Sequence, residues 1–383
     1  MSWDIEPPII KFVDHVLEHA IAHRASDAHF ETFTGSVAIR LRVDGVLQEL
    51  PAPDRHLGDA IISRIKTLAH LDLAEKRLPQ DGHIEKTYLG RTVDFRVSTL
   101  PTQYGESVVL RILDKNSWHF DLDKMGISGD ILTKIRENLQ TGSGILLTTG
   151  PTGSGKTTTL YSALREINNE ETKILTIEDP VEYEVDGIVQ VNVRDELGLS
   201  FERALRAFLR HDPDKILLGE LRDSITAKIA IQAALTGHLV LGTLHTNDAP
   251  GAVTRLIDMG IEPFLISDTL RGILAQRLLR KICENCKKAS IDKSIAIKYP
   301  ELVDSKHYIG HGCQKCNNTG YSGRFGIYEW LDINGKIKQA IRDMGSLESL
   351  QKISMAQGLV PLKAQAITAV KNGQTSIQEL DKV

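Results

Sequence analysis

The sequence predicts an α/β protein, in which a mostly parallel sheet is covered by helices and preceded by a smaller α+β domain. The first observation is the stretch Ile145–Leu160, which has the pattern of a buried strand, a glycine-rich turn and a helix. The second is that three more apolar strands follow in alternation with helical segments, as a parallel sheet requires. The third is that residues 1–115 carry short strands with alternating apolar and polar positions.

Residues 1–115 are expected to form the α+β domain. Apolar residues at helical spacing predict a helix over Ile9–His23, and Asp44-Gly45 marks the turn of a hairpin. Further strands are expected at Thr92–Thr99 and Glu106–Leu113. From the pattern alone, the arginines on these strands favour a solvated or salt-bridged sheet face over a binding site. They are Arg40, Arg42, Arg96 and Arg111.

The glycine-rich turn matches G-x-x-x-x-G-K-[ST], with Gly150, Gly155, Lys156 and Thr157 in the defined places. Glycines let consecutive backbone N–H groups wrap a polyanion, and the following helix adds its positive end. Lys156 is expected to reach the β- and γ-phosphates, and the Thr157 hydroxyl to ligate Mg²⁺. A chance match on a surface loop is the alternative, and the strand and helix around the turn argue against it. The residues predicted to bind the nucleotide here are Gly150, Pro151, Thr152, Gly153, Ser154, Gly155, Lys156, Thr157 and Thr158.

Three downstream strands end in polar residues. The first delivers Glu178, the second ends at Glu220 as a Walker-B acid is presented to Mg²⁺, and the third ends at His245. Ligands of open α/β sheets lie outside the carboxyl ends of the strands. One such residue is more often structural, but three beside one phosphate loop predict a catalytic edge. The sequence contains no N-K-x-D element that would read guanine, so ATP is favoured.

Bulk composition narrows the class of protein. The chain has 383 residues, which is enough for two or three domains. Its formal net charge of −4 lacks the excess of positive charge that is typical of nucleic-acid-binding proteins. No apolar run approaches the roughly 18 residues needed to span a bilayer, and the N-terminus lacks the features of a signal peptide. We therefore expect a cytoplasmic protein that reaches any membrane through a partner.

All four cysteines lie in two pairs of the form C-x₂-C, namely Cys283, Cys286, Cys313 and Cys316. In a reducing compartment this spacing indicates a metal rather than disulfides, and four thiolates suit a structural tetrahedral Zn²⁺. Four unrelated free cysteines are the alternative. A tetracysteine zinc-binding subdomain is thus expected over 281–326, and helical patterns predict a C-terminal helical subdomain over 327–383.

Together these residues resemble the secretion ATPases of type II secretion systems and type IV pili. The likeness covers nearly the whole chain and rests on boxes in a fixed order. These are the phosphate loop Gly150–Thr158, the aspartate box Ile177–Glu182, the Walker B Leu218–Asp223 and the histidine box Thr236–Asn247. Upstream, Arg42–Val46, Leu78–Gly82 and Ser98–Pro101 are also similar to the family.

The resemblance implies a RecA-like core over 127–280, joined by a linker over 116–126 to a PAS-like N-terminal domain. It also implies a homohexamer with ATP at the junction of the two domains. Arg96 and Arg111 would then approach the phosphates. Arg206 and Arg210 match further family arginines that bind the nucleotide.

Roles at the catalytic edge also follow from the resemblance. Glu178 matches the glutamate that orients or activates the attacking water, and Glu220 the acid that holds Mg²⁺ through water. Which of the two is the general base stays open. His238 and His245 match residues that sense the γ-phosphate.

The implied function is a hexameric motor that works on inner-membrane platform proteins to assemble a type II secretion pseudopilus or a type IV pilus. The cysteine insertion indicates an assembly rather than a retraction ATPase. Many assembly members carry a further N-terminal docking domain, whereas here the strand-rich domain starts almost at once. A DNA-handling or conjugation motor is the rival, and the acidic balance argues against it. A nucleotide-gated scaffold with negligible turnover is a third hypothesis.

Overall fold

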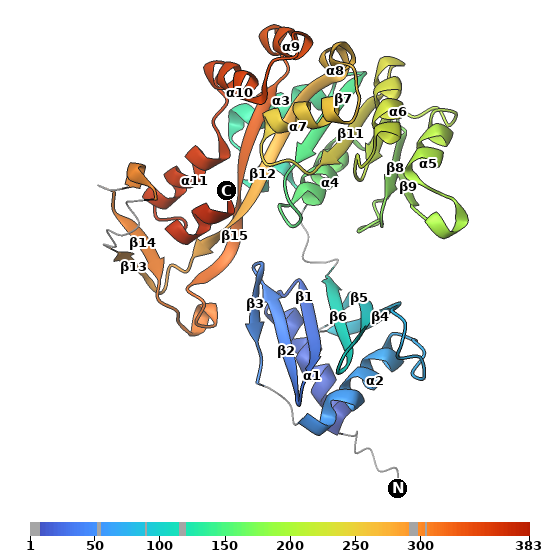
Figure 1. Ribbon diagram of the computed structural model, residues 1–383, viewed down its shortest axis with the longest axis vertical. Helices are drawn as coiled ribbons and strands as arrows, with labels where there is room; N and C mark the ends of the chain where they lie inside the picture. The colour runs from blue at the N-terminus through green and yellow to red at the C-terminus, as the bar shows by residue number, and fades with distance from the viewer. Residues whose placement is uncertain (1–7, 52–54, 89, 115–119, 291–297, 303–304) are drawn as a thin grey trace. The chain divides into compact units, whose positions relative to one another are not determined.

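The computed structural model divides the chain into two compact units, Met1–His119 and Phe120–Val383 (Figure 1). The residues it describes are 8–51, 55–88, 90–114, 120–290, 298–302 and 305–383. Residues 116–119 of the predicted linker lie outside the described residues. The remainder of that linker belongs to the second unit, where Leu122–Met125 forms a 3₁₀ helix. The finer five-part division of the chain stays a prediction.

The N-terminal unit is a six-stranded antiparallel sheet in the order β3-β2-β1-β6-β5-β4. Two helices pack on one face of this sheet, where their buried residues and those of the strands form a single apolar cluster. The predicted helix, hairpin and two strands are confirmed, whereas β1 and β4 were not predicted. The elements are α1 (Pro8–Ala22), β1 (Asp27–Phe33), β2 (Ser36–Val43), β3 (Val46–Glu49), α2 (Gly58–Leu68), β4 (Gln80–Tyr88), β5 (Arg91–Thr102) and β6 (Gly105–Leu113).

A row of directly opposed residues crosses the other face of this sheet. Asp27 on β1 stands opposite Arg42 on β2 and Arg111 on β6, and Arg111 stands opposite Arg96 on β5. Asp27 pairs with both neighbours, at 3.8 Å from Arg42 Nε and 3.3 Å from Arg111 Nε. Arg40 forms a two-pronged pair with Glu31, each bond 2.6 Å long. The expected salt-bridged sheet face is confirmed for these pairs, and the row concentrates positive charge in one line.

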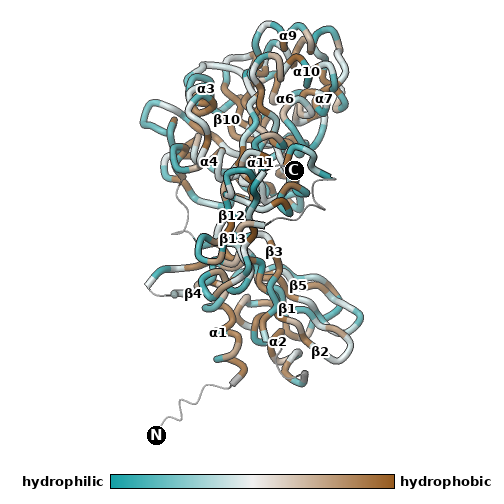
Figure 2. Tube along the Cα trace, turned by 90° about the vertical axis from the view of Figure 1, so that its left-hand side faces the viewer, coloured by the Kyte–Doolittle hydropathy of each residue, from teal (hydrophilic) through white to brown (hydrophobic). Residues whose placement is uncertain are grey.

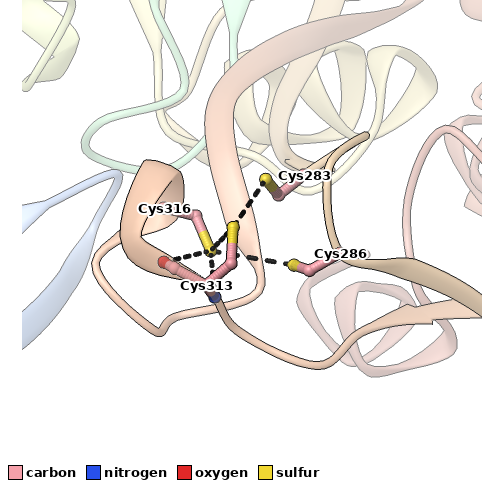
Figure 3. A group of neighbouring side chains, drawn as sticks. All are labelled: Cys283, Cys286, Cys313 and Cys316. Atoms are coloured by element: carbon pink, nitrogen blue, oxygen red, sulfur yellow. Dashed lines mark hydrogen bonds between the residues drawn. The ribbon is translucent and has the colours of Figure 1, made fainter.

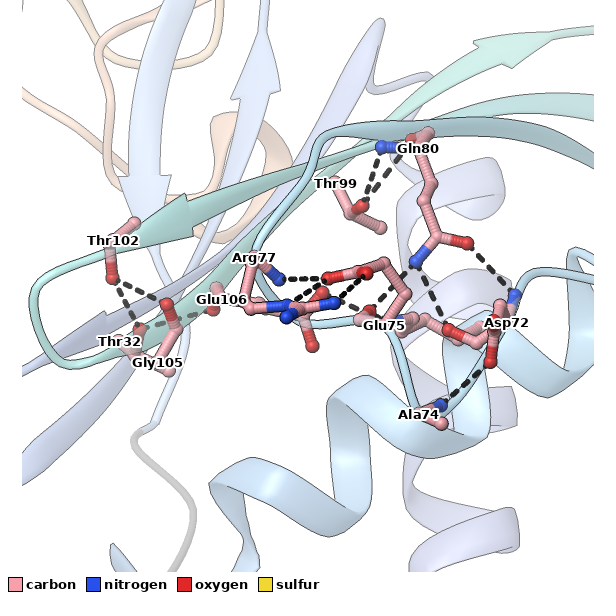
Figure 4. Close-up of polar contacts among 11 residues, drawn as sticks. Thr32, Asp72, Ala74, Glu75, Arg77, Gln80, Thr99, Thr102, Gly105 and Glu106 are labelled. Carbon is pink, nitrogen blue, oxygen red and sulfur yellow. Dashed lines mark hydrogen bonds and ion pairs between the residues drawn. The ribbon is translucent and has the colours of Figure 1, made fainter.

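The segment between α2 and β4 is held by a buried cation. Lys66, only 1% exposed, donates to Glu106 Oε1 at 2.9 Å and to the Glu75 carbonyl at 2.7 Å. Gln80 Nε2 donates to the same carbonyl at 3.0 Å (Figure 4). Because both partners of the Lys66–Glu106 pair are buried, loss of either would leave an uncompensated charge. This network fixes the segment that precedes the Leu78–Gly82 motif.

The second unit contains a seven-stranded sheet in the order β15-β12-β7-β11-β10-β8-β9. Every neighbouring pair is parallel except β12 with β15. The strands are β7 (Gly144–Thr149), β8 (Ile174–Glu178), β9 (Ile188–Asn192), β10 (Lys215–Leu218), β11 (Leu239–Leu244), β12 (Leu270–Ile282) and β15 (Tyr321–Asp332). The predicted mostly parallel sheet is therefore confirmed.

Both faces of this sheet are buried. On β7, Ile145 and Leu147 belong to one apolar core and Leu146 to another. The helices over 129–139 and 156–167 cover the second core, and the helices between 201 and 371 contribute to the first (Figure 1). Hydrophobic stretches accordingly run through the middle of the unit, with hydrophilic ones on outer loops (Figure 2). Burial on both faces explains why these strands are continuously apolar in sequence.

The helices of this unit are α3 (Gly129–Leu139), α4 (Lys156–Ile167), α5 (Phe201–Phe208), α6 (Ser224–Leu235), α7 (Ala249–Asp258), α8 (Pro263–Thr269), α9 (Gly335–Arg342), α10 (Leu347–Ala356) and α11 (Leu362–Lys371). Two short strands, β13 (Lys287–Ser290) and β14 (His307–Gly310), form a separate antiparallel pair. The three last helices confirm the helical C-terminal region. β15 crosses the predicted boundary at residue 326 and joins that region to the core sheet.

Candidate functional site

The phosphate loop, residues 150–155, connects β7 to α4, which begins at Lys156. Gly150 has φ 150° and Gly155 φ 90°, values that side-chain-bearing residues rarely adopt. A Cβ on Gly150 would also come within 2.5 Å of the Gln276 carbonyl oxygen. The strand–turn–helix context predicted for the loop is confirmed, and glycine is required at Gly150 by conformation and by space and at Gly155 by conformation.

Lys156 folds over its own loop. Its Nζ donates to the Gly150 carbonyl at 2.7 Å and to the Pro151 carbonyl at 3.1 Å. Burial lowers the pKa of Lys156 to about 8, with Glu220 opposing and Arg277 adding to this effect. The ammonium thus lies in a partly desolvated place, where an anionic partner would be strongly favoured.

Glu220 and His245 meet beside this lysine. Glu220 Oε1 lies 3.3 Å from His245 Nε2, and Glu220 Oε2 accepts from Arg222 Nε at 2.6 Å. Arg222 Nη1 also donates to Asp179 Oδ2 at 3.1 Å. Burial, followed by the charge of Lys156, lowers the pKa of His245. The ends of β8, β10 and β11 therefore converge at the loop, as the sequence pattern predicts.

Glu178 ends β8 and is only 4% exposed. Tyr161 Oη and Thr176 Oγ1 each donate to its carboxylate at 2.6 Å. Burial raises the pKa of Glu178 despite these bonds. Together with Thr157 and Glu220, it lines a cavity of about 110 Å³. The site thus offers one buried and one half-exposed carboxylate beside the residue predicted to ligate the metal.

Three further predicted residues of the second unit, His238, Arg206 and Arg210, contact groups other than the loop. His238 precedes β11 at the amino end of the sheet, opposite to His245, and its Nδ1 lies 2.9 Å from the Ala233 carbonyl. Arg206 and Arg210 are exposed. Arg206 Nε donates to Glu202 at 3.0 Å, and Arg210 Nη1 donates to the Arg206 carbonyl at 2.7 Å. These contacts stay within α5 and its end, so the nucleotide roles of these three residues remain predictions, as do those of Arg96 and Arg111.

Gln276 on β12 was missed by sequence reasoning. It is 1% exposed, its Nε2 donates to the Ser154 carbonyl at 2.7 Å, and its Oε1 accepts from Thr159 Oγ1 at 2.8 Å. Its neighbour Arg277 is also buried. The available signal was a polar pair between the apolar runs Ile273–Ala275 and Leu278–Leu279, since buried polar groups need partners.

The four predicted zinc ligands come together, with their sulfurs within 4.8 Å of one another (Figure 3). Sγ–Sγ distances are 3.8 Å for Cys283–Cys313 and Cys286–Cys316, and 3.7 Å for Cys313–Cys316. With Zn–S bonds of about 2.3 Å, a tetrahedral site has sulfur–sulfur edges of about 3.8 Å. The donor set therefore fits Zn²⁺.

The pairing of β13 with β14 explains how distant cysteine pairs meet. Lys287, which follows Cys286, stands opposite Gly310, and Gly310 lies three residues before Cys313 in the sequence. Gly310 also abuts Gly320, where a Cβ on Gly310 would lie 1.9 Å from the Gly320 carbonyl oxygen. The long connection between the pairs therefore does not separate them.

Hydrogen bonds to sulfur favour the thiolate of Cys313, whereas burial raises the pKa of Cys286 to about 11. Asn285 Nδ2 donates to Cys313 Sγ at 3.3 Å, which lowers the pKa of Cys313 to about 6. Gly320 N donates to Cys316 Sγ at 3.3 Å. Because the thiolate is the metal ligand, these bonds suit metal binding.

Comparison with known proteins identifies the family. The model for type II/IV secretion system proteins matches residues 4–382. Type II secretion system ATPase E of Vibrio cholerae is 48% identical over 99% of this chain and 76% of its own length. Type IV pilus assembly ATPase PilB of Myxococcus xanthus is 45% identical over 98% of this chain and 68% of its own length.

Solved structures agree on the fold. The ATPase DotB of Legionella pneumophila superposes with a TM-score of 0.73 at 23% identity, covering 99% of this chain and 97% of its own. The pilus retraction motor PilT with bound ADP gives 0.65 at 26% identity, over the same shares of the two chains. These likenesses confirm an α/β fold with a RecA-like core. No helix among the described residues is long and apolar enough to cross a membrane.

Proposed function

The chain belongs to the family of type II/IV secretion system proteins, and we propose how its residues work as an ATPase of that family. Its function is to hydrolyse ATP and so power the assembly of a type II secretion pseudopilus or a type IV pilus. The observation that carries the proposal is the convergence of Lys156, Glu220 and His245 at the carboxyl edge of the sheet.

The loop cradles the phosphates of ATP with its backbone N–H groups, and Lys156 exchanges loop carbonyls for phosphate oxygens. Thr157 and Glu220, which line one cavity, would hold Mg²⁺. When bound, this ion neutralises charge on the β- and γ-phosphates. His245 responds to the γ-phosphate, and its contact of 3.3 Å with Glu220 supports this role.

Glu178 orients the attacking water and accepts its proton at a carboxylate oxygen. Its raised pKa brings it nearer to the operating pH, which suits a general base. Tyr161 and Thr176 hold the carboxylate in place. Glu220 is the alternative base, although its contacts with Arg222 and His245 favour a metal-holding role.

The N-terminal unit, with its antiparallel sheet and helices on one face, is the PAS-like domain that supplies positive charge. Arg96 and Arg111 stabilise the transferring phosphoryl group, as their adjacent places in the charged row support. Arg206, Arg210 and His238 contribute to nucleotide binding between subunits. The working assembly is a cytoplasmic homohexamer docked on inner-membrane platform proteins, and the four cysteines hold one Zn²⁺.

Lys156→Ala tests the assignment of the nucleotide site. We expect ATP hydrolysis to be abolished while the melting temperature stays near that of the parent protein, because a partly desolvated charge is removed from the start of α4. Lys134→Ala, which removes a surface lysine 3.9 Å from Asp332, is the matched control and should retain full turnover. Normal hydrolysis by Lys156→Ala would show that the phosphate loop is not part of the active site.

Ring assembly has a separate test. If charge on one subunit completes the site of another, turnover per chain should rise with protein concentration as rings form. The measurement pairs ATPase rates with light scattering across a dilution series. A demonstrably monomeric sample as active per chain as the hexamer would refute the hexameric motor.

A further inference from the structure

Two consecutive residues of β12 contact the two loops that frame the nucleotide site. The first is Gln276, whose amide nitrogen donates to Ser154 O at 2.7 Å and whose amide oxygen accepts from Thr159 Oγ1 at 2.8 Å. One partner belongs to the phosphate loop and the other to the first turn of α4. Because Gln276 is buried, loss of its side chain would remove the hydrogen bond to the Ser154 carbonyl in a dry place and leave the Thr159 hydroxyl only its 3.2 Å bond to the Gly155 carbonyl.

Arg277 contacts the other loop, His245–Asp248. Its Nη2 donates to the Asn247 carbonyl at 2.9 Å and to Asn247 Oδ1 at 3.3 Å. Its Nη1 donates to the carbonyl of Gln276 at 3.1 Å. The residue is 6% exposed, yet these acceptors are neutral oxygens. The carboxylates of Glu329 and Asp248 interact with its charge, and its hydrogen bonds connect it to the Asn247 loop.

The strand register explains why these two residues reach both loops. β12 runs parallel to β7, with Ala275 opposite Thr149, so the next two residues lie level with the start of the phosphate loop. Consecutive side chains of a strand point to opposite faces. The backbones approach closely, since a Cβ on Gly150 would lie 2.5 Å from the Gln276 carbonyl oxygen.

We propose that Gln276 and Arg277, together termed the β12 clamp, are positioning residues that hold the phosphate loop and the His245–Asp248 loop in one arrangement for hydrolysis. The proposal rests on the proposed function of the phosphate loop as the ATP site. Gln276 orients the loop that binds the phosphates common to ADP and ATP, so it governs nucleotide affinity. Arg277 orients the loop that carries His245, so it governs the hydrolytic step.

The experiment measures ADP dissociation constants, KM, kcat and melting temperature for variants of the full chain. Gln276→Met keeps the side-chain volume and removes both hydrogen bonds. It should raise the Kd for ADP and the KM for ATP by about tenfold or more, with kcat at saturation changed by less than about threefold. An unchanged Kd for ADP would overturn the role of Gln276.

Arg277→Lys keeps the charge and loses the planar fork whose Nη2 reaches Asn247 and whose Nη1 reaches the Gln276 carbonyl. It should lower kcat by about tenfold or more and leave the Kd for ADP within about threefold of the parent. Unchanged kcat would overturn the role of Arg277. A purely structural role for the pair would lower the melting temperature without this split between affinity and turnover, and that result would also overturn the clamp.

Two further variants complete the design. Gln276→Asn keeps the amide but shortens its reach, so it should still weaken ADP binding if Gln276→Met does not fold, and parental affinity would contradict the proposal. Ser162→Ala removes a buried hydroxyl on α4 that donates to Thr158 O, away from the clamp, and should leave both constants unchanged. If Lys156→Ala loses activity while the clamp variants behave as the parent, only the clamp fails. Full activity in Lys156→Ala would instead refute the ATP site itself.

Discussion

The nucleotide site and the cysteine cluster both suit a charged ligand, but they prepare for it differently. In the cluster, sulfur–sulfur distances of 3.7–3.8 Å already match a zinc tetrahedron. At the phosphate loop, the charged groups are instead occupied by partners within the protein. Lys156 donates to loop carbonyls, and Glu220 contacts Arg222 and His245. A site for a permanent metal gains from a fixed geometry. A site whose ligand binds, reacts and leaves must exchange partners in every cycle.

The largest expected effect would show that the nucleotide site needs charge from outside the core. Arg111→Ala should slow ATP hydrolysis by about 10³-fold or more, as loss of an arginine finger does, while zinc content and melting temperature stay unchanged. Arg42→Ala is the matched control, because both arginines pair with Asp27. Equal rates in the two variants would show that only the ion pair with Asp27 matters.

Glu178→Gln should strongly reduce ATP turnover without weakening nucleotide binding. We expect kcat to fall by about 10²–10⁴-fold with the Kd for ADP unchanged, since a base is lost but the loop is intact. The raised pKa of Glu178 also means that its ionised form is disfavoured in the folded state, so its contribution to stability declines as pH rises through that pKa. The variant should therefore melt no lower than the parent at pH 8. Parental turnover would assign the base to Glu220.

Cys283→Ser should affect the other site alone. Metal analysis should show about one zinc per chain in the parent and a clear loss in the variant, with a lower melting temperature for the C-terminal region. ADP affinity should be unchanged. Asn285→Ala, which removes the hydrogen bond to Cys313 Sγ but keeps all four sulfurs, should retain zinc with about tenfold weaker affinity. Freshly purified, reduced parent protein without zinc would contradict the assignment.

The smallest effect is a shift in pH dependence. The Tyr161 hydroxyl lowers the pKa of Glu178, so Tyr161→Phe should raise that pKa further. Because the active base is the carboxylate, activity falls as pH drops through this pKa. The acidic limb of the kcat profile should therefore move to higher pH. Tyr328→Phe, whose parent hydroxyl donates to the Met125 carbonyl, is the control, and an identical shift in both variants would contradict the assignment.

The hairpin around Asp44-Gly45 and four of the seven core strands, β7, β8, β10 and β11, were predicted because their apolar patterns are strong. β9, β12 and β15 were not predicted, although β12 is mostly buried. β4 was missed because it is an edge strand on which Ile84 is the single buried residue. β1 has a clear alternation over only a few residues, with Ala28 and Phe30 buried. Strands that bury little leave little trace in composition.

The sequence by itself determined the phosphate loop, the carboxylates and His245 at strand ends, and the four cysteines, because each depends on local spacing or on the common direction of parallel strands. Only the tertiary structure decided that His238 lies at the opposite edge of the sheet and that Gln276 holds the phosphate loop. Likewise, the β13–β14 pair brings Cys286 to Cys313 across a long connection. Such contacts join residues far apart in the chain, and strand register and packing set them rather than any spacing that a single sequence displays.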